Sequence, residues 1–422
     1  MNKNEKTALP QLRFLQFKDS PAWNISSFGK LIIPVKDRAG TKKYTLMSVT
    51  SGVGLIPQIE KFGREIAGNA YSSYYVIKKN DFAYNKSATK QFPEGYISML
   101  TEYDEAALPN SIFACFRIVD DGCVPKFFYH LFHNNYHGSW LRKYIEVGAR
   151  AHGSLSVDTK HLWDMPVALP RTEEQRKIAD CLSSLDDLIA AEDKKLEALK
   201  AHKKGLMQKL FPAEGKTVPE WRFIEFRGSG EWEEKPLAQV GNIITGSTPS
   251  TADVDNYGGN KMFVSPADMS ELKYVVETKT KLTGKGFSTT RKILANSVLF
   301  VCIGATIGKV ALNKCECATN QQINAIVPFE DYISDFIYYT LDLNSSKISK
   351  LAGKQAVPIV NKSLFSSIVV SIPEYDEQQK IADCLSGIDD LITEQANKIE
   401  ALKAHKKGLM QGLFPSIEEV GG

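Results

Sequence analysis

One glycine-rich stretch has the residue types of a phosphate-binding loop. GATIGKV (304–310) places two glycines and a lysine close together. A Walker motif needs four residues between its glycines and Ser or Thr after the lysine. Here only three residues separate the glycines, and Val310 follows the lysine. The spacing therefore favours a tight turn between buried strands over a nucleotide site.

Three histidines and two cysteines have the residue types of a metal site. His130, His133 and His137 would face one way on a helix, as metal ligands do, but no nearby cysteine or carboxylate completes a set. Cys315 and Cys317 lack a second pair at zinc spacing and are interpreted as ordinary thiols. The chain has no Pro-Pro dipeptide, which excludes the Asp/Asn-Pro-Pro-aromatic signature of amino-methyltransferases. We expect no metal, no cofactor, no catalytic residues and no enzymatic activity.

Polar loops carry the remaining chemistry. Basic, hydroxyl and amide side chains gather in GTKKYTLMS, YNKSATKQ and GARAHGS, and later in TGSTPSTADVDNYGGNK, CATNQQ and AGKQAVP. Lysine and arginine contact phosphates, whereas Asn, Gln, Ser and Thr can position on the backbone or read base edges. The mixture fits a DNA-reading surface, although polar loops are also the default on any protein.

Length and composition indicate the class of protein. With 422 residues, 43% hydrophobic and 24% charged, the chain is expected to form at least two globular domains. No apolar run is long enough for a membrane span, and MNKNEKTALP is not a signal peptide, so a cytoplasmic location is expected. The net charge of +3 permits nucleic-acid binding through local patches.

An internal repeat organises the chain. Residues 170–212 match residues 373–415 at 30 of 43 positions without a gap, and EALKAHKKGLMQ occurs in both copies. Upstream, LPQLRFLQFKDSPAW from Leu9 aligns with VPEWRFIEFRGSGEW from Val218. The intervening segments share little identity. Two dissimilar units are therefore each followed by a nearly identical segment.

Both repeated segments are predicted to be long helices. They lack internal proline, and each ends at Leu-Phe-Pro. Apolar residues alternate at spacings of four and three, which is typical of a coiled-coil seam. The predicted seam residues are Leu185, Ile189, Glu192, Leu196, Leu199, Lys203, Leu206, Ile392, Gln395, Ile399, Leu402, Lys406 and Leu409.

An antiparallel pair is expected, with Leu196 facing Leu402. That register sets Glu192 against Lys406 and Lys203 against Gln395, which keeps the lysines away from aliphatic partners. The alternative is that each helix packs only on its own domain.

The dissimilar units are predicted to be α+β. Residues 71–87 and 289–310 are expected to form strands joined by turns at KKN and LANS. Helices are expected within 125–145 and 331–351.

This arrangement resembles the specificity subunit of type I restriction-modification enzymes. The resemblance rests on the paired PxxxEQxKIADCL starts at 170 and 373, the LFP ends, GSTPS (246–250) and ATNQQINAIVP (318–328). It implies two target recognition domains, 1–170 and 213–373, and two antiparallel spacer helices with pseudo-twofold symmetry, 171–212 and 374–415, before a tail at 416–422.

The resemblance also implies partners. Each recognition domain would read half of a bipartite, asymmetric double-stranded DNA target. The helices would dock two copies of an adenine methyltransferase subunit, and a restriction or translocase subunit would join them. Two alternatives stay open: a recognition subunit of another methylation or defence system, and a coiled-coil scaffold that does not bind DNA.

Candidate DNA contacts follow from loop position. Gln321 and Gln322 are set apart, because amides beside buried strands often satisfy backbone groups. The candidate contacts are Lys42, Lys43, Lys86, Lys90, Arg150, Thr248, Ser250, Tyr257, Lys261, Lys354 and Gln355.

Overall fold

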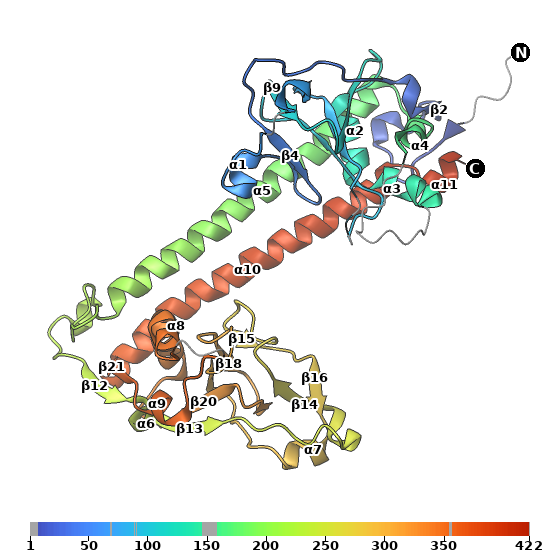
Figure 1. Cartoon of the computed structure of the whole chain (residues 1–422). Coiled ribbons are helices and arrows are strands. Elements are labelled where there is room, and N and C mark those ends of the chain that lie inside the picture. The colour runs from blue at the N-terminus through green and yellow to red at the C-terminus, as the bar shows by residue number, and fades with distance from the viewer. Residues whose placement is uncertain are drawn as a thin grey trace, which may run out of the picture. The chain divides into compact units, whose positions relative to one another are not determined.

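The computed structural model describes residues 7–67, 70–87, 89, 91–145, 158–353 and 357–421. The chain divides into two compact units. The first unit comprises Met1–Ala191 and Ile399–Gly422, and the second comprises Glu192–Lys398. Two long helices dominate Figure 1, α5 (Thr172–Leu210) in green and α10 (Tyr375–Leu413) in red. Each unit contains the first part of one long helix and the last part of the other.

The first unit is built from small antiparallel sheets. Their strand orders are β1-β2-β11, β3-β10-β7-β8, β4-β5 and β6-β9. The strands are β1 (Thr7–Ala8), β2 (Trp23–Ser27), β3 (Ile32–Pro34), β4 (Met47–Thr50), β5 (Gly54–Pro57), β6 (Tyr75–Lys78), β7 (Phe82–Asn85), β8 (Tyr96–Met99), β9 (Glu105–Leu108), β10 (Phe113–Ile118) and β11 (Pro166–Leu169). The shorter helices are α1 (Gln58–Phe62), α2 (Pro125–His133), α3 (Tyr136–Leu141), α4 (Thr159–Trp163) and α11 (Ile417–Gly421).

The second unit has a larger central sheet. Its order is β13-β20-β17-β18-β15, beside β16-β14-β19 and β12-β21. The strands are β12 (Glu233–Pro236), β13 (Gly241–Thr245), β14 (Tyr257–Val264), β15 (Tyr274–Val275), β16 (Thr280–Leu282), β17 (Val298–Val301), β18 (Val310–Asn313), β19 (Ala318–Thr319), β20 (Ile323–Pro328) and β21 (Val369–Ile372). The helices are α6 (Leu237–Val240), α7 (Gly284–Ser288), α8 (Ser334–Lys350) and α9 (Lys362–Ser366).

The two units share one topology. The order β3-β10-β7-β8 in the first unit corresponds strand by strand to β13-β20-β17-β18 in the second, and all six pairings are antiparallel. In each unit a helix follows this sheet, α2 after β10 and α8 after β20. The strand that precedes each long helix then pairs with an early strand of its unit, β11 with β2 and β21 with β12. One α+β fold is therefore made by two dissimilar sequences.

The predicted turns and helices are present. Asn80 lies in the KKN turn between β6 and β7, and Asn296 in LANS before β17. Both have positive φ (72° and 60°), a conformation that asparagine tolerates better than most residues. GATIGKV contains the turn between the paired strands β17 and β18, with positive φ at Gly304 and Gly308, and its Val310 begins β18. The helices expected within 125–145 and 331–351 are α2 with α3, and α8.

Each unit has a main core closed by both long helices. In the first unit, Ile178 and Leu182 of α5 and Leu413 of α10 join an aromatic cluster on α2 that includes Phe128. The second unit uses the matching positions of the repeat. There Ile381, Leu385 and Leu210 join Phe336, Ile337 and Tyr339 of α8. Burial of these apolar side chains anchors the dissimilar parts of the chain to the repeated helices.

Candidate functional site

A buried glutamine connects each long helix to its unit. Gln175 accepts a hydrogen bond from the Val124 amide (2.9 Å) and donates to the carbonyls of Gly122 and Pro170 (both 2.9 Å). Val124 precedes α2, so the glutamine satisfies a backbone donor at the start of that helix. We call this set of contacts the glutamine link of the first unit.

Gln378 makes the same link in the second unit. It accepts from the Ile333 amide (3.1 Å), just before α8, and donates to the carbonyls of Asp331 (3.3 Å) and Pro373 (3.0 Å). Every partner in both links is a backbone atom. Dissimilar sequences can therefore meet the same helix start, which explains the P-x-x-x-E-Q pattern.

A bidentate ion pair lies beside each glutamine link. The Arg13 guanidinium donates to both carboxylate oxygens of Glu174 at 2.7 Å, and Arg222 donates to those of Glu377 at 2.7 and 2.6 Å. All four side chains are at most 10% exposed. Each arginine also donates to two carbonyls of its own segment, seven and eight residues further along. These contacts hold the segment that enters each unit against the first turn of a long helix.

The helix register differs from the one expected. In the second unit Glu192 meets Gln395 and Lys398 (2.6 Å each), and not Lys406. Lys203 pairs with Asp389 at 2.6 Å, and not with Gln395. A residue further along α5 contacts a residue earlier in α10, since Glu192 meets Gln395 and Lys203 meets Asp389. The segments are therefore antiparallel, as predicted. The expected register is nevertheless wrong.

The repeat explains the observed register. Glu192 and Gln395 occupy the same position in the two copies, and so do Lys203 and Lys406. In the first unit Lys406 contacts Asp186, which is the counterpart of Asp389. Each lysine therefore meets the same aspartate of the opposite copy. These aspartates flank the apolar seam, so the heptad pattern alone did not reveal them.

The predicted seam residues are shielded from solvent. Gln395 and Ile399 are buried, and the other predicted members are partly buried. His202, Lys204 and their copies His405 and Lys407 are exposed. The repeat thus has one inward face and one outward face.

Three of the candidate lysines in the first unit can be placed. Lys42 is exposed, pairs with Glu105 at 3.0 Å and lies over the Tyr44 ring. Lys43 is exposed, and Lys86 directly follows β7 and is half-buried. Lys90 and Arg150 lie outside the described residues. The structure therefore brings Lys42 close to a carboxylate, which would compete with a phosphate for its charge.

The second-unit candidates that the structure describes lie in or beside one loop, which connects β13 to β14. Thr248 donates to Gln321 (2.6 Å), and Tyr257 donates to the Pro249 carbonyl (2.9 Å). Ser250 is exposed, and its carbonyl accepts from Asn256 (3.1 Å). Lys354 and Gln355 fall outside the described residues. Of the two glutamines set apart, Gln322 donates to the Ile303 carbonyl (3.3 Å), as expected of a structural amide, whereas Gln321 is exposed.

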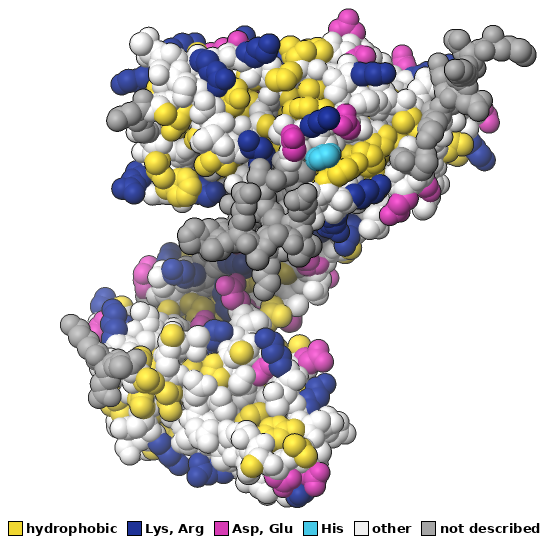
Figure 2. Space-filling model, turned by 45° about the vertical axis from the view of Figure 1, so that its right-hand side comes forward, with side chains coloured by type: hydrophobic (Ala, Val, Ile, Leu, Met, Phe, Trp, Pro, Cys, Tyr) yellow, Lys and Arg dark blue, Asp and Glu magenta, His cyan; other side chains and the backbone are white. Residues whose placement is uncertain are grey.

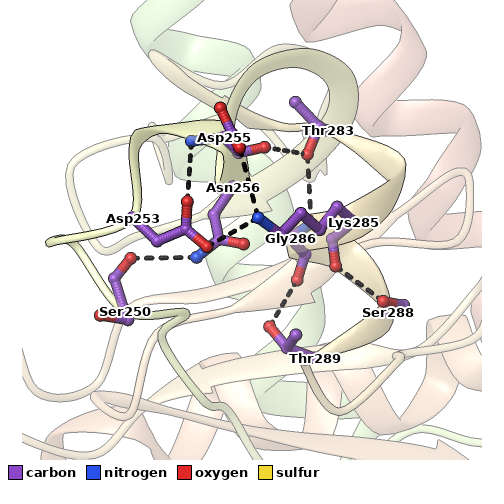
Figure 3. A network of polar contacts seen from close by, with 9 residues as sticks. All are labelled: Ser250, Asp253, Asp255, Asn256, Thr283, Lys285, Gly286, Ser288 and Thr289. Atoms are coloured by element: carbon purple, nitrogen blue, oxygen red, sulfur yellow. Dashed lines mark hydrogen bonds and ion pairs between the residues drawn. The ribbon is translucent and has the colours of Figure 1, made fainter.

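Figure 3 shows the polar network that supports this loop against α7. The Thr283 hydroxyl donates to the Asp255 carbonyl (2.6 Å) and accepts from the Gly286 amide (3.1 Å). Lys285 pairs with Asp253 at 2.9 Å and Asp255 at 3.4 Å, which raises the pKa of Lys285, chiefly through Asp253. The charge of Lys285 on α7 is therefore already neutralised by the two aspartates of the loop.

Lys292 is a basic residue that the sequence analysis did not single out. Its ammonium lies 5.6 Å from the centre of the Phe287 ring, and that of the candidate Lys261 lies 5.7 Å from the same ring. Both lysines are exposed. Their proximity depends on how β14 packs near α7, which the linear spacing does not reveal.

Lysine and arginine do not form one dominant patch on the face drawn in Figure 2. Their side chains are spread over both units and are interrupted by uncharged and acidic ones. Charge alone therefore does not mark a nucleic-acid contact surface on this face.

The three histidines pack into the first unit. His130 and His137 are buried, and burial lowers their pKa values to about 3 and about 4. His130 hydrogen bonds to Ser183 (3.1 Å), and His133 to Tyr96 (3.4 Å). Within the described ranges no group of three or more His, Cys, Asp or Glu side chains is arranged to hold a metal ion. In the same part of the chain, no helix has the length and apolar character required to cross a membrane.

Comparison with known proteins gives one consistent family. Residues 49–201 and 229–404 match the family model described as type I restriction modification DNA specificity domain. A putative type I restriction enzyme MjaX specificity subunit of Methanocaldococcus jannaschii is 27% identical over 64% of this chain and 63% of its own. The HindI specificity subunit of Haemophilus influenzae is 34% identical over 34% and 32%. The chain thus spans less than two thirds of the length of these relatives.

A solved structure supports the fold. The S subunit of a type I restriction-modification system from M. genitalium superposes with a TM-score of 0.58, covering 97% of this chain and all of that one. Its sequence identity is 13%, so the likeness concerns the fold alone.

Proposed function

This chain belongs to the type I restriction modification DNA specificity domain family, and from that premise we propose that it is the DNA-reading subunit of a type I restriction-modification complex. Residues 1–170 and 213–373 are the two recognition domains. The spacers are 171–212 and 374–415, and 416–422 forms the tail. The chain itself is non-catalytic: it selects the DNA sequence on which its partners act.

The shared topology of the two units carries this proposal. Two sheets of the same strand order, built from dissimilar sequences, present different loops from equivalent frameworks. Two recognition domains with the same framework would each face a DNA duplex in the same way, and their different loops would read different bases. The target is therefore bipartite and asymmetric, unlike the palindromes that match true homodimers.

The long helices act as the spacer. With 39 residues each, α5 and α10 would each extend roughly 58 Å. One DNA turn measures about 34 Å. The helices are thus long enough to separate half-sites by some unread base pairs. The matched Lys–Asp pairs and the Glu192–Gln395 contact support one fixed register.

The partners are double-stranded DNA, two copies of an adenine methyltransferase subunit, and restriction or translocase subunits. Duplication of the helix surface supports two copies of one partner, because equivalent patches bind equivalent molecules. The candidates Lys42, Lys43, Lys86, Lys90, Arg150, Thr248, Ser250, Tyr257, Lys261, Lys354 and Gln355 remain proposed DNA contacts, and we add Lys292.

Methylation mapping tests the proposal. The full chain would be co-expressed with the methyltransferase subunit of its system, and methylated adenines would be mapped by long-read sequencing. We expect one bipartite, asymmetric motif that disappears when this chain is omitted. Methylation of the same motif without this chain, or no salt-dependent affinity of the assembled complex for duplex DNA, would refute the proposal.

A further inference from the structure

The segment that enters each unit presents an exposed aliphatic side chain on a short turn. These entry turns are Leu12–Phe17 in the first unit and Trp221–Phe226 in the second. Each contains a 3₁₀ helix, Leu15–Phe17 or Ile224–Phe226. Leu15 is 87% exposed and Ile224 is 78% exposed. These two residues occupy the same place in the upstream repeat.

The entry turns match in more than their sequence. Residues 12–20 and 221–229 have the same order of exposed and partly buried positions. Phe14 and Phe223, which precede the 3₁₀ helices, have φ/ψ of −59°/140° and −57°/149°. The two turns therefore present Leu15 and Ile224 from the same backbone conformation.

Both turns are held rigidly from two sides. Arg13 and Arg222 tie them to the first turn of one long helix through the bidentate pairs described above. The Leu12 amide donates to the Gly412 carbonyl (2.8 Å), and the Trp221 amide to the Lys209 carbonyl (2.9 Å), in the last turn of the other helix.

One difference between the helix copies follows from this packing. A Cβ on Gly412 would lie 2.5 Å from the Leu12 side chain, so glycine leaves room for leucine. In the second unit the Lys209 ammonium lies 4.0 Å from the Trp221 ring centre, a cation–π contact. The sequences thus differ while the geometry of the two turns is kept.

Basic residues flank each aliphatic side chain. Lys18 and Arg227 are exposed immediately after the 3₁₀ helices. From the long helices, Lys177 lies 5.8 Å from the Phe14 ring centre and Lys380 lies 5.7 Å from that of Phe223. In the second unit Glu225 partly offsets Lys380, at 3.1 Å. Each patch thus combines an exposed aliphatic side chain with a basic residue of the same turn and a basic residue of a long helix, which suits an apolar hollow with an acidic rim.

Single exposed aliphatic residues are common on protein surfaces. Other examples here, Val254 (79% exposed) and Val276 (70%), lie in segments that differ between the halves. Leu15 and Ile224 instead belong to the parts of the chain that are repeated. A surface kept in both halves, beside dissimilar readers, is what a partner present in two copies requires.

We propose that the two entry turns are docking sites for the methyltransferase subunit, one copy on each unit. Leu15 and Ile224 each insert into an apolar hollow of that subunit, and Lys18 or Arg227 faces acidic residues at its rim. This inference rests on the proposed function and identifies where that partner binds.

Native mass spectrometry of the full chain with the methyltransferase subunit of the same system tests the inference. We expect the unaltered chain to load two copies, and Leu15→Glu or Ile224→Glu to load one. The double variant should weaken both sites at least roughly tenfold, as expected for losing the burial of an aliphatic side chain. The charge reversals Lys18→Glu and Arg227→Glu should weaken the same sites.

Matched controls are Val254→Glu and Val53→Glu, which alter side chains that are 79% and 65% exposed outside the entry turns. They should still load two copies, and thermal melting should match the unaltered chain in every variant. Unchanged loading of both sites by the double variant, or loss at only one turn, would overturn the inference. Intact loading with reduced DNA binding would assign the turns to DNA and would overturn it too. If the unaltered chain loads no methyltransferase subunit, the proposed function fails first.

Discussion

Gln395 donates its side-chain amide to Glu192 twice, to the carboxylate at 2.6 Å and to the backbone carbonyl at 3.0 Å. These residues are one position of the repeat, present once in each helix. When a residue contacts the counterpart position of the other repeat copy, that contact lies near the centre of an antiparallel pair. The lysine–aspartate pairs Lys203–Asp389 and Lys406–Asp186 are likewise the same contact made in each direction.

Lengthening both spacers should change the gap in the DNA target and nothing else. Inserting four residues after Ala198 and after Ala401 adds about one turn, or about 6 Å, to each helix. We expect methylation mapping to return the same two half-sites with a gap altered by about two base pairs, since each pair rises about 3.4 Å. Altered half-site bases with the original gap would contradict the ruler role. Substituting exposed Ala198 and Ala401 by glutamate, without insertion, should leave the motif unchanged.

Lys261 and Lys292 should contribute to DNA affinity through phosphates. Replacing either by alanine is expected to weaken binding to all sequences alike and to reduce the slope of log affinity against log salt by about 1. Fluorescence anisotropy of the assembled complex at several salt concentrations measures both quantities. Lys285→Ala is the matched control: Asp253 and Asp255 already neutralise Lys285, so its loss should leave the slope unchanged. An equal slope change for Lys285→Ala would refute the distinction.

The glutamine link should be necessary for the stability of the second unit. Gln378→Leu removes three hydrogen bonds to backbone groups of Ile333, Asp331 and Pro373. Because buried backbone groups lose their partner, we expect destabilisation by about 2–4 kcal/mol in urea unfolding. Gln175→Leu should act similarly on the first unit. Arg176→Leu, at an exposed neighbouring position, should change stability little. A Gln378→Leu variant as stable as the parent would show that the link is dispensable.

The first unit should lose stability in mild acid through His137. This side chain is buried, and burial lowers its pKa from 6.5 to about 4, against a smaller opposing effect of the nearby Glu94. The unfolded chain therefore binds the proton more readily than the folded chain between these pH values. Stability is fully present above pH 6.5 and falls as the pH drops towards 4, by about 2 kcal/mol at pH 5.

The variant His137→Leu checks the origin of this pH dependence. It should flatten the change in melting temperature between pH 7 and pH 5, whatever its effect at pH 7. His202→Leu removes an exposed histidine and is the control, expected to keep the parent's pH profile. An identical profile for His137→Leu and the parent would assign the acid sensitivity to other groups, such as His130 or His133.

The repeat was enough to predict two long helices that run antiparallel, because a sustained apolar spacing has few other structural solutions. It was not enough for the register. The prediction aligned aliphatic residues of the seam, whereas Asp186 and Asp389 beside the seam attract Lys406 and Lys203. The spacing of apolar residues carries no information about an ion pair between a lysine and an aspartate that lies beside the seam.

The family, the duplicated layout and the helices follow from the sequence, since these depend on identity and periodicity along the chain. The common sheet topology of the dissimilar segments is visible only in the folded chain, because backbone hydrogen bonds join strands without regard to side-chain identity. The fold also places Gln175 and Gln378 against backbone atoms. It leaves Leu15 and Ile224 exposed, whereas the side chains of Arg13 and Arg222 are at most 10% exposed. Those outcomes depend on which distant segments meet in space, and local spacing does not contain that information.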